Sequence, residues 1–118
     1  MTEPYELTLT EAATAIAARQ LSPVELTTAA LERIDAVDDK VGAFRTVTAD
    51  AALAAAAQAE REITAGRSRG PLHGIPLGRK DLYDTAGVPN EGSSAARAGN
   101  TPETDSASMA ALSRAGMV

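Results

Sequence analysis

The chain contains no cysteine and only one histidine, His73, among its 118 residues. Without cysteine there can be no disulfide, no thiol nucleophile and no thiolate metal site. A single histidine argues strongly against a histidine-based metal centre. We therefore expect a protein that uses neither a metal nor another cofactor.

Aromatic residues and positive charge are also scarce. The chain has three aromatic residues, and its formal net charge is −5. Nucleic acid is therefore not an expected partner, because phosphate binding needs a basic surface. The longest apolar run, residues 51–59, is too short and too weakly hydrophobic to span a bilayer. The acidic, polar start is no signal peptide, so we expect a soluble cytoplasmic protein.

Alanine is abundant instead, with 26 residues, and hydrophobic residues make up 44% of the chain. This composition favours helices that pack closely through small side chains. Two capping boxes mark helix starts, because a Ser or Thr is followed three residues later by Glu. Three long helices are predicted: from Thr8 to about Gln20, from Ser22 to about Val37, and from Thr48 to Gly66.

Two short strands and a last helix complete the prediction. β-branched and aromatic residues favour a strand over 43–47, and the apolar residues 75–77 favour another. The last helix should be capped by Thr104 or Asp105 and end at Gly116. The two apolar residues that follow it look like the first step of a further strand. The chain is expected to form one domain or part of one.

The stretch "GIPLGRKDLYDTAGVP" (Gly74–Pro89) contains one of only two lysines, Lys80, next to Asp81. The simplest interpretation is a strand flanked by turns with Lys80 solvated at the surface. A second interpretation is that Lys80 lies at a strand end, inside a cleft, and transfers protons. Free lysine has a pKa of about 10.4. Burial lowers the pKa of an ammonium group, and it can do so enough for the neutral amine to act as a general base.

The block "GPLHGIPLGRKDLYDTAGVP" closely resembles the amidase signature family, whose members carry a G-[IV]-P-x-x-x-K-D-x-x-D-T-x-G-V-P segment. The resemblance covers nearly the whole chain. The helices within "LTEAATAIAARQLSPVELTTAALERIDAVDDKVGAF" resemble the family's opening helices. The segment "TPETDSASMAALSRAGMV" resembles the family segment with the pattern P-x-x-D-a-x-x-v-x-x-L-x-x-A-G-A-V.

This resemblance implies the α/β class, as the N-terminal portion of an α/β/α sandwich, helix-rich with a few short strands. It implies a hydrolase that cleaves amide bonds with a serine, a second serine in a cis peptide, and a lysine. Lys80 stands at the position of that lysine. The family's two serines lie downstream in a Gly/Ser-rich segment that this chain does not contain.

The chain departs from the family pattern at several positions. Ser94 matches the serine of a "TTxGS"-like loop, but Ser93 stands where glycine is usual, and Arg79 replaces a commonly apolar residue. We expect neither serine to be the nucleophile. The remaining polar candidates are expected to be structural: His73 in the "GPLHG" turn, Tyr83 and Asp84 in loop packing and a turn hydrogen bond, and Asp38 and Asp39 at a solvated helix end.

We therefore expect residues 1–118 to form a single partial domain that carries the catalytic Lys80 and is inactive alone. Three hypotheses remain open: an incomplete amidase, one half of a split amidase, and a non-catalytic helical interaction module. The expected partners are a small-molecule amide substrate, if the missing region is supplied, and a complementing polypeptide or a second copy of the chain. The sequence does not identify the substrate.

Overall fold

The computed structural model describes residues 2–118. Its contacts divide the chain into two compact units. Unit 1 comprises Met1–Leu77 together with Ala115–Val118, and unit 2 comprises Gly78–Arg114. Candidate Lys80 belongs to unit 2, whereas the long helices belong to unit 1.

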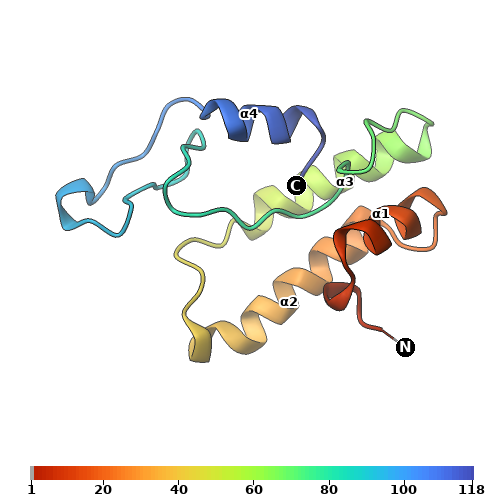
Figure 1. Cartoon of the computed structure of the whole chain (residues 1–118), viewed down its shortest axis with the longest axis horizontal. Helices are drawn as coiled ribbons and strands as arrows, with labels where there is room; N and C mark the ends of the chain where they lie inside the picture. The colour runs from red at the N-terminus through yellow and green to blue at the C-terminus, as the bar shows by residue number, and fades with distance from the viewer. Residues whose placement is uncertain (1) are drawn as a thin grey trace. The chain divides into compact units, whose positions relative to one another are not determined.

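Unit 1 is built from a 3-10 turn, η1 (Pro4–Glu6), and three helices, α1 (Leu9–Ala17), α2 (Pro23–Val41) and α3 (Ala49–Thr64) (Figure 1). All three predicted helices are present. α1 ends earlier than predicted because Arg19 adopts a left-handed backbone (φ +57°) just beyond it. α2 is longer than predicted: it ends at Val41, and the residue that follows it, Gly42, is also left-handed (φ +62°).

The two capping boxes form as predicted. The Glu11 N–H donates to Thr8 Oγ1 (3.2 Å), and the Thr8 N–H donates to Glu11 Oε2 (2.8 Å). The same pair of bonds joins Ser22 and Glu25, at 3.0 and 2.8 Å. These bonds satisfy backbone donors that the first turn of a helix leaves free, and the bond from the Thr8 backbone holds the pKa of Glu11 below its usual value. The predicted cap of α3 is absent, because Thr48 makes no side-chain cap bond.

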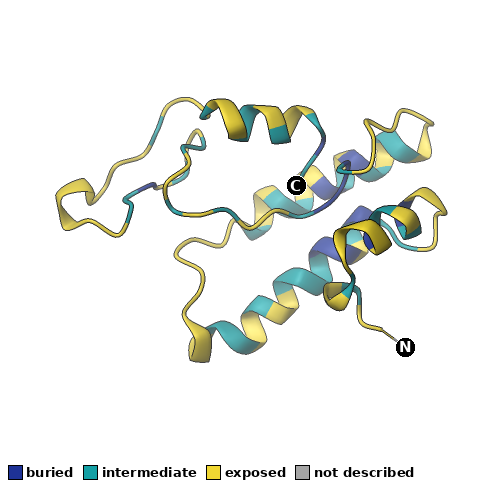
Figure 2. Ribbon diagram, viewed as in Figure 1, coloured by how far each residue is buried: buried dark blue, intermediate teal, exposed yellow. Residues whose placement is uncertain are grey.

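The core of unit 1 is small. Four of its buried side chains form one cluster from α1, α2 and the segment after α3: Ala12, Ile16, Leu26 and Ile75. Figure 2 shows buried positions on the helices of this unit, with exposed positions on their outer faces. Glycine allows a close approach at Gly74, where an added Cβ would lie 2.6 Å from Pro23 Cγ and where φ is +82°.

The predicted strands are not formed: the described residues, 2–118, contain no β-strand. In the 43–47 segment the Ala43 and Phe44 N–H groups donate to Asp38 Oδ1 instead of to a neighbouring strand (2.7 and 3.2 Å). The 75–77 segment pairs with the end of the chain through two backbone bonds to Val118, next to one bond from Gly74 to Gly116. A strand needs a partner along its length, and the described chain offers only this short one.

His73 is buried in unit 1 and joins α3 to the loop that follows it. Its Nδ1 accepts from the Arg69 N–H (3.0 Å), and its Nε2 faces Glu62 Oε2 (2.9 Å). Glu62 also accepts from Gln58 Nε2 (2.9 Å) and pairs with the Arg69 guanidinium (3.2 Å). The bond from Gln58, followed by the positive charge of Arg69, holds the pKa of Glu62 below its usual value. Both ring nitrogens of His73 are therefore used structurally.

The Glu62 network predicts an acid-dependent loss of stability. A carboxyl whose pKa is lower in the folded state stabilises the fold above its unfolded pKa, and this stabilisation is lost as pH falls through the folded value. We expect the melting temperature to decrease as pH falls below about 4.3, the ordinary pKa of glutamate. Glu62→Gln should lower the melting temperature at pH 7 and flatten this decrease, whereas Glu60→Gln on the same helix should do neither. Equal acid slopes for Glu62→Gln and wild type would contradict the assignment.

Unit 2 is mostly loop. It contains a 3-10 turn, η2 (Ala95–Arg97), and one helix, α4 (Ala107–Arg114). α4 ends at Arg114, two residues before the predicted end at Gly116, and neither Thr104 nor Asp105 caps it. The Ser106 hydroxyl accepts from the Met109 N–H (3.3 Å) and takes that role. Asp105 is used elsewhere, because its carboxylate accepts from the Ala86 N–H (2.8 Å).

Candidate functional site

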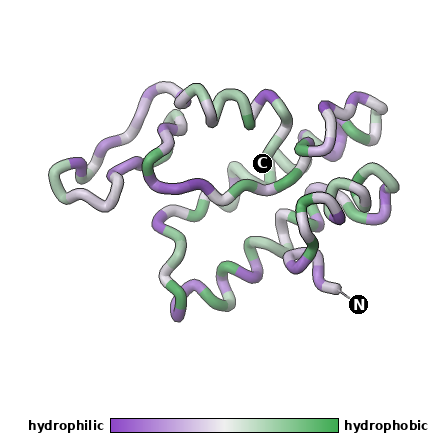
Figure 3. Tube along the Cα trace, viewed as in Figure 1, coloured by the Kyte–Doolittle hydropathy of each residue, from purple (hydrophilic) through white to green (hydrophobic). Residues whose placement is uncertain are grey.

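Lys80 lies in a tight turn that begins three residues after the apolar 75–77 segment. Figure 3 shows the change from hydrophobic to hydrophilic residues at this point of the chain. The Lys80 carbonyl accepts from the Leu82 N–H (2.7 Å) and the Tyr83 N–H (3.2 Å). The residue is exposed. The burial that would favour a neutral lysine is therefore not supplied by the described chain.

Asp81 ties this turn to the loop ten residues later. Its Oδ1 accepts from the Glu91 N–H (3.2 Å). The next residue, Gly92, approaches closely enough that an added Cβ would lie 3.7 Å from the Asp81 carbonyl oxygen and 3.6 Å from Leu82 Cδ2. The carboxylate beside the candidate lysine thus fixes where the 91–94 loop lies relative to the turn.

Asp84 and Asn90 form a second hydrogen-bonded link within this loop region. Asn90 is 1% exposed, and its Nδ2 donates to Asp84 Oδ1. The backbone of Asn90 donates to the Asn100 carbonyl (2.9 Å) and accepts from Asn100 Nδ2 (2.8 Å). Asp84 thus forms a hydrogen bond, but the bond joins side chains six residues apart and does not close a turn as predicted. The sequence reasoning missed Asn90, and an asparagine directly after Pro89 in a loop is the one signal that points to it.

Buried polar atoms without a hydrogen-bond partner are concentrated in the same segment. Within the described residues they are Asp81 Oδ2, Thr85 Oγ1 and Asn90 Oδ1, together with one threonine hydroxyl in α2. Buried polar atoms in folded proteins are nearly always bonded, so each exception asks for an explanation. Among the described residues of unit 2, the buried polar atoms that lack a hydrogen-bond partner all lie in the segment that carries Lys80.

The two serines considered as nucleophiles lie in a turn from Glu91 to Ser94, closed by the Ser94 N–H on the Glu91 carbonyl (3.0 Å). Both central residues are left-handed, Gly92 at φ +57° and Ser93 at φ +58°. A turn of this kind favours glycine at both positions. Ser93 therefore occupies a glycine-type backbone position, which matches the glycine that the family usually has there. Ser93 and Ser94 are both exposed.

This strain gives a stability prediction. A non-glycine residue in the left-handed region costs about 1–2 kcal/mol, whereas glycine adds about 0.4–1 kcal/mol of unfolded-state entropy. Ser93→Gly should therefore stabilise the protein by about 0.5 kcal/mol, measured as an increase in the urea midpoint. Ser93→Ala keeps the strain and should give no gain. A loss of stability in Ser93→Gly would show that the hydroxyl makes a contact worth more than the strain.

The other residues named from the sequence are structural or exposed. Tyr83 is 46% exposed, and its backbone carbonyl accepts from Arg79 Nη1 (2.9 Å). Asp38 lies at the end of α2 as predicted, where it binds the two N–H groups described above. Among residues 2–118 no group of acidic residues and histidine is arranged to hold a metal ion.

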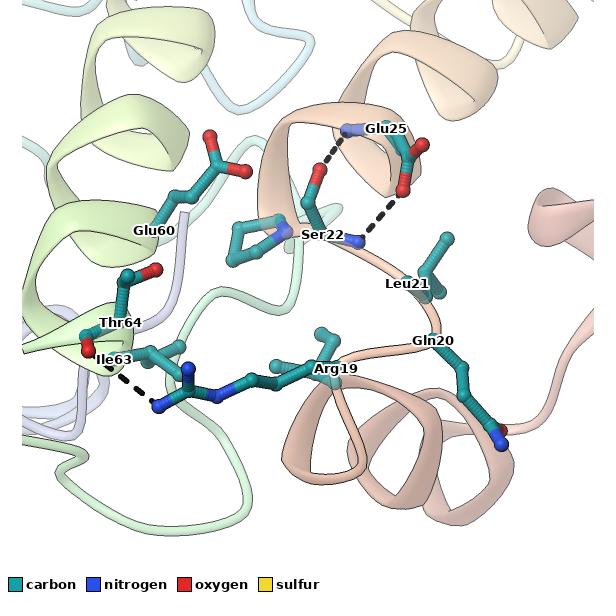
Figure 4. A pocket seen from close by; sticks show the side chains of 10 residues that line it. Arg19, Gln20, Leu21, Ser22, Glu25, Glu60, Ile63 and Thr64 are labelled. Atoms are coloured by element: carbon teal, nitrogen blue, oxygen red, sulfur yellow. Dashed lines mark hydrogen bonds between the residues drawn. The ribbon is translucent and has the colours of Figure 1, made fainter. Parts of the chain in front are cut away.

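Unit 1 contains a shallow hollow of about 320 Å³ between the end of α1, the start of α2 and the end of α3 (Figure 4). Arg19 Nη2 donates to the Thr64 carbonyl across it (3.4 Å), and Ser22 and Glu25 line another side through their capping box. None of the residues singled out in the 80–94 segment lines this hollow.

The helices of residues 2–118 include none with the length and hydrophobicity that are needed to span a bilayer.

Comparison with known proteins identifies the family. The Amidase family model matches residues 25–118, and the chain belongs to this family. It is 45% identical over all 118 residues to a glutamyl-tRNA(Gln) amidotransferase subunit of Chloroflexus aurantiacus. Among solved structures it resembles the native peptide amidase of Stenotrophomonas maltophilia (TM-score 0.90, 36% identity, 99% of this chain) and a fatty acid amide hydrolase (TM-score 0.90, 26% identity, 100% of this chain).

The chain spans only about a quarter of the length of these relatives. The chain covers 24% of the Chloroflexus protein, 24% of the peptide amidase chain and 21% of the fatty acid amide hydrolase chain. These solved structures have the amidase-signature fold, so the α/β class expected from the sequence is supported for the portion of that fold that this chain covers. The strands expected from that class are absent from the described residues.

Proposed function

We propose that the chain is the lysine-bearing portion of an amidase-family hydrolase of carbon–nitrogen bonds, with Lys80 as its general base. The family match over residues 25–118 is the observation that carries the proposal, because the Lys80 block lies within it. Residues 1–118 then form a single partial domain of a cytoplasmic enzyme. The substrate class is a small-molecule amide.

The mechanism assigns one step to this chain. The neutral Lys80 amine takes the proton of a serine held in a cis peptide, and that serine takes the proton of the nucleophilic serine. The nucleophile then attacks the amide carbonyl, and water hydrolyses the resulting acyl-enzyme. Both serines, and the donors that stabilise the oxyanion, must come from residues outside this chain. Asp81 and Asp84 position the Lys80 turn through the bonds described above.

The exposure of Lys80 supports an incomplete site rather than a working one. Burial by a complementing polypeptide would favour the neutral amine. The proposal therefore requires a second portion of an amidase domain that covers Lys80 and brings the serines.

Activity measurements test this proposal. We expect the chain alone to hydrolyse no small amide faster than Lys80→Ala does. We expect turnover to appear when the chain is mixed with the part of the peptide amidase that follows the matched region, here called the amidase remainder. Turnover by the chain alone that disappears in Lys80→Ala would contradict the incomplete-site account.

The alternative is a helical interaction module without chemistry, and the small core of unit 1 is the observation that favours it. Apolar side chains from four of its segments remain exposed: Tyr5, Leu9, Val41, Phe44 and Val47. Such side chains suit association with another protein or with a second copy. Binding of the amidase remainder without any Lys80-dependent turnover would favour this alternative.

A further inference from the structure

Arg79 is the charged residue next to the candidate base that the proposed mechanism does not use. It stands directly before Lys80, where the family usually has an apolar residue. Arg79 is half-buried, and its Nη1 donates to the Tyr83 carbonyl (2.9 Å). The donor and the acceptor are only four residues apart in the sequence. The bond is therefore formed within one turn and depends on no other part of the fold.

The bond from Arg79 completes the turn that contains Lys80. At the start of the turn, the Lys80 carbonyl accepts from the Leu82 and Tyr83 N–H groups (2.7 and 3.2 Å). At its end, the Tyr83 carbonyl accepts from the Arg79 guanidinium. A charged donor forms a stronger hydrogen bond than a neutral one. The positive charge of Arg79 is therefore held against the turn.

The other charges around the Lys80 turn are negative. Residues 79–84, and residues 90–92 that are bonded to them, carry three acidic side chains: Asp81, Asp84 and Glu91. Each of these carboxylates accepts a hydrogen bond from a donor within residues 90–99. Within the described residues, none of the three forms an ion pair with Lys80. A nearby carboxylate still favours the ammonium form of a lysine without direct contact.

We propose that Arg79 is a positioning residue that favours the neutral amine of Lys80. Its bond to Tyr83 holds a permanent positive charge on the turn that contains Lys80, and a like charge disfavours the ammonium form. This charge opposes the three carboxylates. The inference rests on the proposed function, because Arg79 acts only through the candidate base. The apolar residue usual at this position supplies neither the hydrogen bond nor the charge.

Competitive labelling of the two lysines tests this inference in the whole chain, without the amidase remainder. Acetic anhydride reacts with the neutral amine of a lysine, and Lys40 in unit 1 serves as the internal reference. Two unit charges about 7 Å apart in water change a protonation equilibrium roughly 3-fold. We therefore expect Arg79→Met to lower the ratio of Lys80 to Lys40 labelling about 2- to 3-fold in about 0.01 M salt, measured by mass spectrometry.

Salt and a control variant separate the effect of the charge from a change in the shape of the turn. At about 1 M salt the charge is screened within a few ångströms, so the ratios of wild type and Arg79→Met should become equal. Arg67 lies in the exposed loop after α3. Arg67→Met removes one positive charge from unit 1 and should leave the labelling ratio unchanged at either salt concentration.

The labelling result is independent of whether the proposed function holds. An unchanged ratio in Arg79→Met at low salt would overturn the inference even if the mixture with the amidase remainder hydrolyses amides. A ratio that falls equally at low and high salt would also overturn it, because a charge effect must be screened. A salt-sensitive fall without any hydrolysis by the mixture would support the role of Arg79 and count against Lys80 as a base.

Discussion

Gly116→Ala is expected to destabilise the protein by about 3 kcal/mol, a large part of the stability of a small domain. Gly116 has a left-handed backbone (φ +91°), which costs a non-glycine residue about 1–2 kcal/mol. An added Cβ would also lie 2.8 Å from His73 Cγ and 3.1 Å from the His73 Cα. His73 cannot move aside easily, because both of its ring nitrogens are bonded.

Gly66→Ala is the matched control. Gly66 has a similar backbone (φ +78°), but nothing lies within 4 Å of an added Cβ. It should cost only the backbone strain, about 1 kcal/mol. Urea unfolding of the two variants separates the strain from the clash. Equal midpoints would show that the close packing of Gly116 on His73 contributes nothing to the stability of unit 1.

Lys80→Arg is expected to reduce the activity of the mixture with the amidase remainder by about 10²–10⁴-fold, the usual contribution of a general base. Arginine keeps the length and the charge of the side chain but does not lose its proton in proteins. It should therefore remove proton transfer, and burial of its permanent charge should weaken binding of the remainder. Lys80→Ala should remove activity to the same extent.

The second lysine provides the control for this variant. Lys40 lies near the end of α2 in unit 1, and Lys40→Arg should leave the activity of the mixture unchanged. Rates of amide hydrolysis at saturating remainder, with binding measured in parallel, give the comparison. Full activity in Lys80→Arg at unchanged affinity would remove Lys80 from the reaction.

The helices could be predicted from the sequence because their starts are local. A capping box depends on residues three apart, and both boxes formed at Thr8 and Ser22. The strands could not be predicted in the same way. The 43–47 segment has strand-forming residues, but its first N–H groups bind Asp38, which lies only five residues before Ala43. A strand depends on a partner that no local pattern reveals.

The candidate site, too, could be predicted only in part from the sequence. The position of Lys80 follows from a motif that the resemblance identified, and the family match includes it. The contacts that fix the Lys80 turn do not follow from the motif. Asp81 binds an N–H ten residues away, and Asp105 binds the Ala86 N–H although its position suits a helix cap. Such choices depend on which loop segments meet in the fold.

The most direct test of the account is the location of the reactive serine. A fluorophosphonate probe labels a serine that has been activated by a neighbouring base, and mass spectrometry of the digested mixture identifies the labelled peptide. We predict that the label is found on a serine of the amidase remainder, only when this chain is present, and that Lys80→Arg abolishes it. A label on Ser93 or Ser94 in the chain alone would contradict the account.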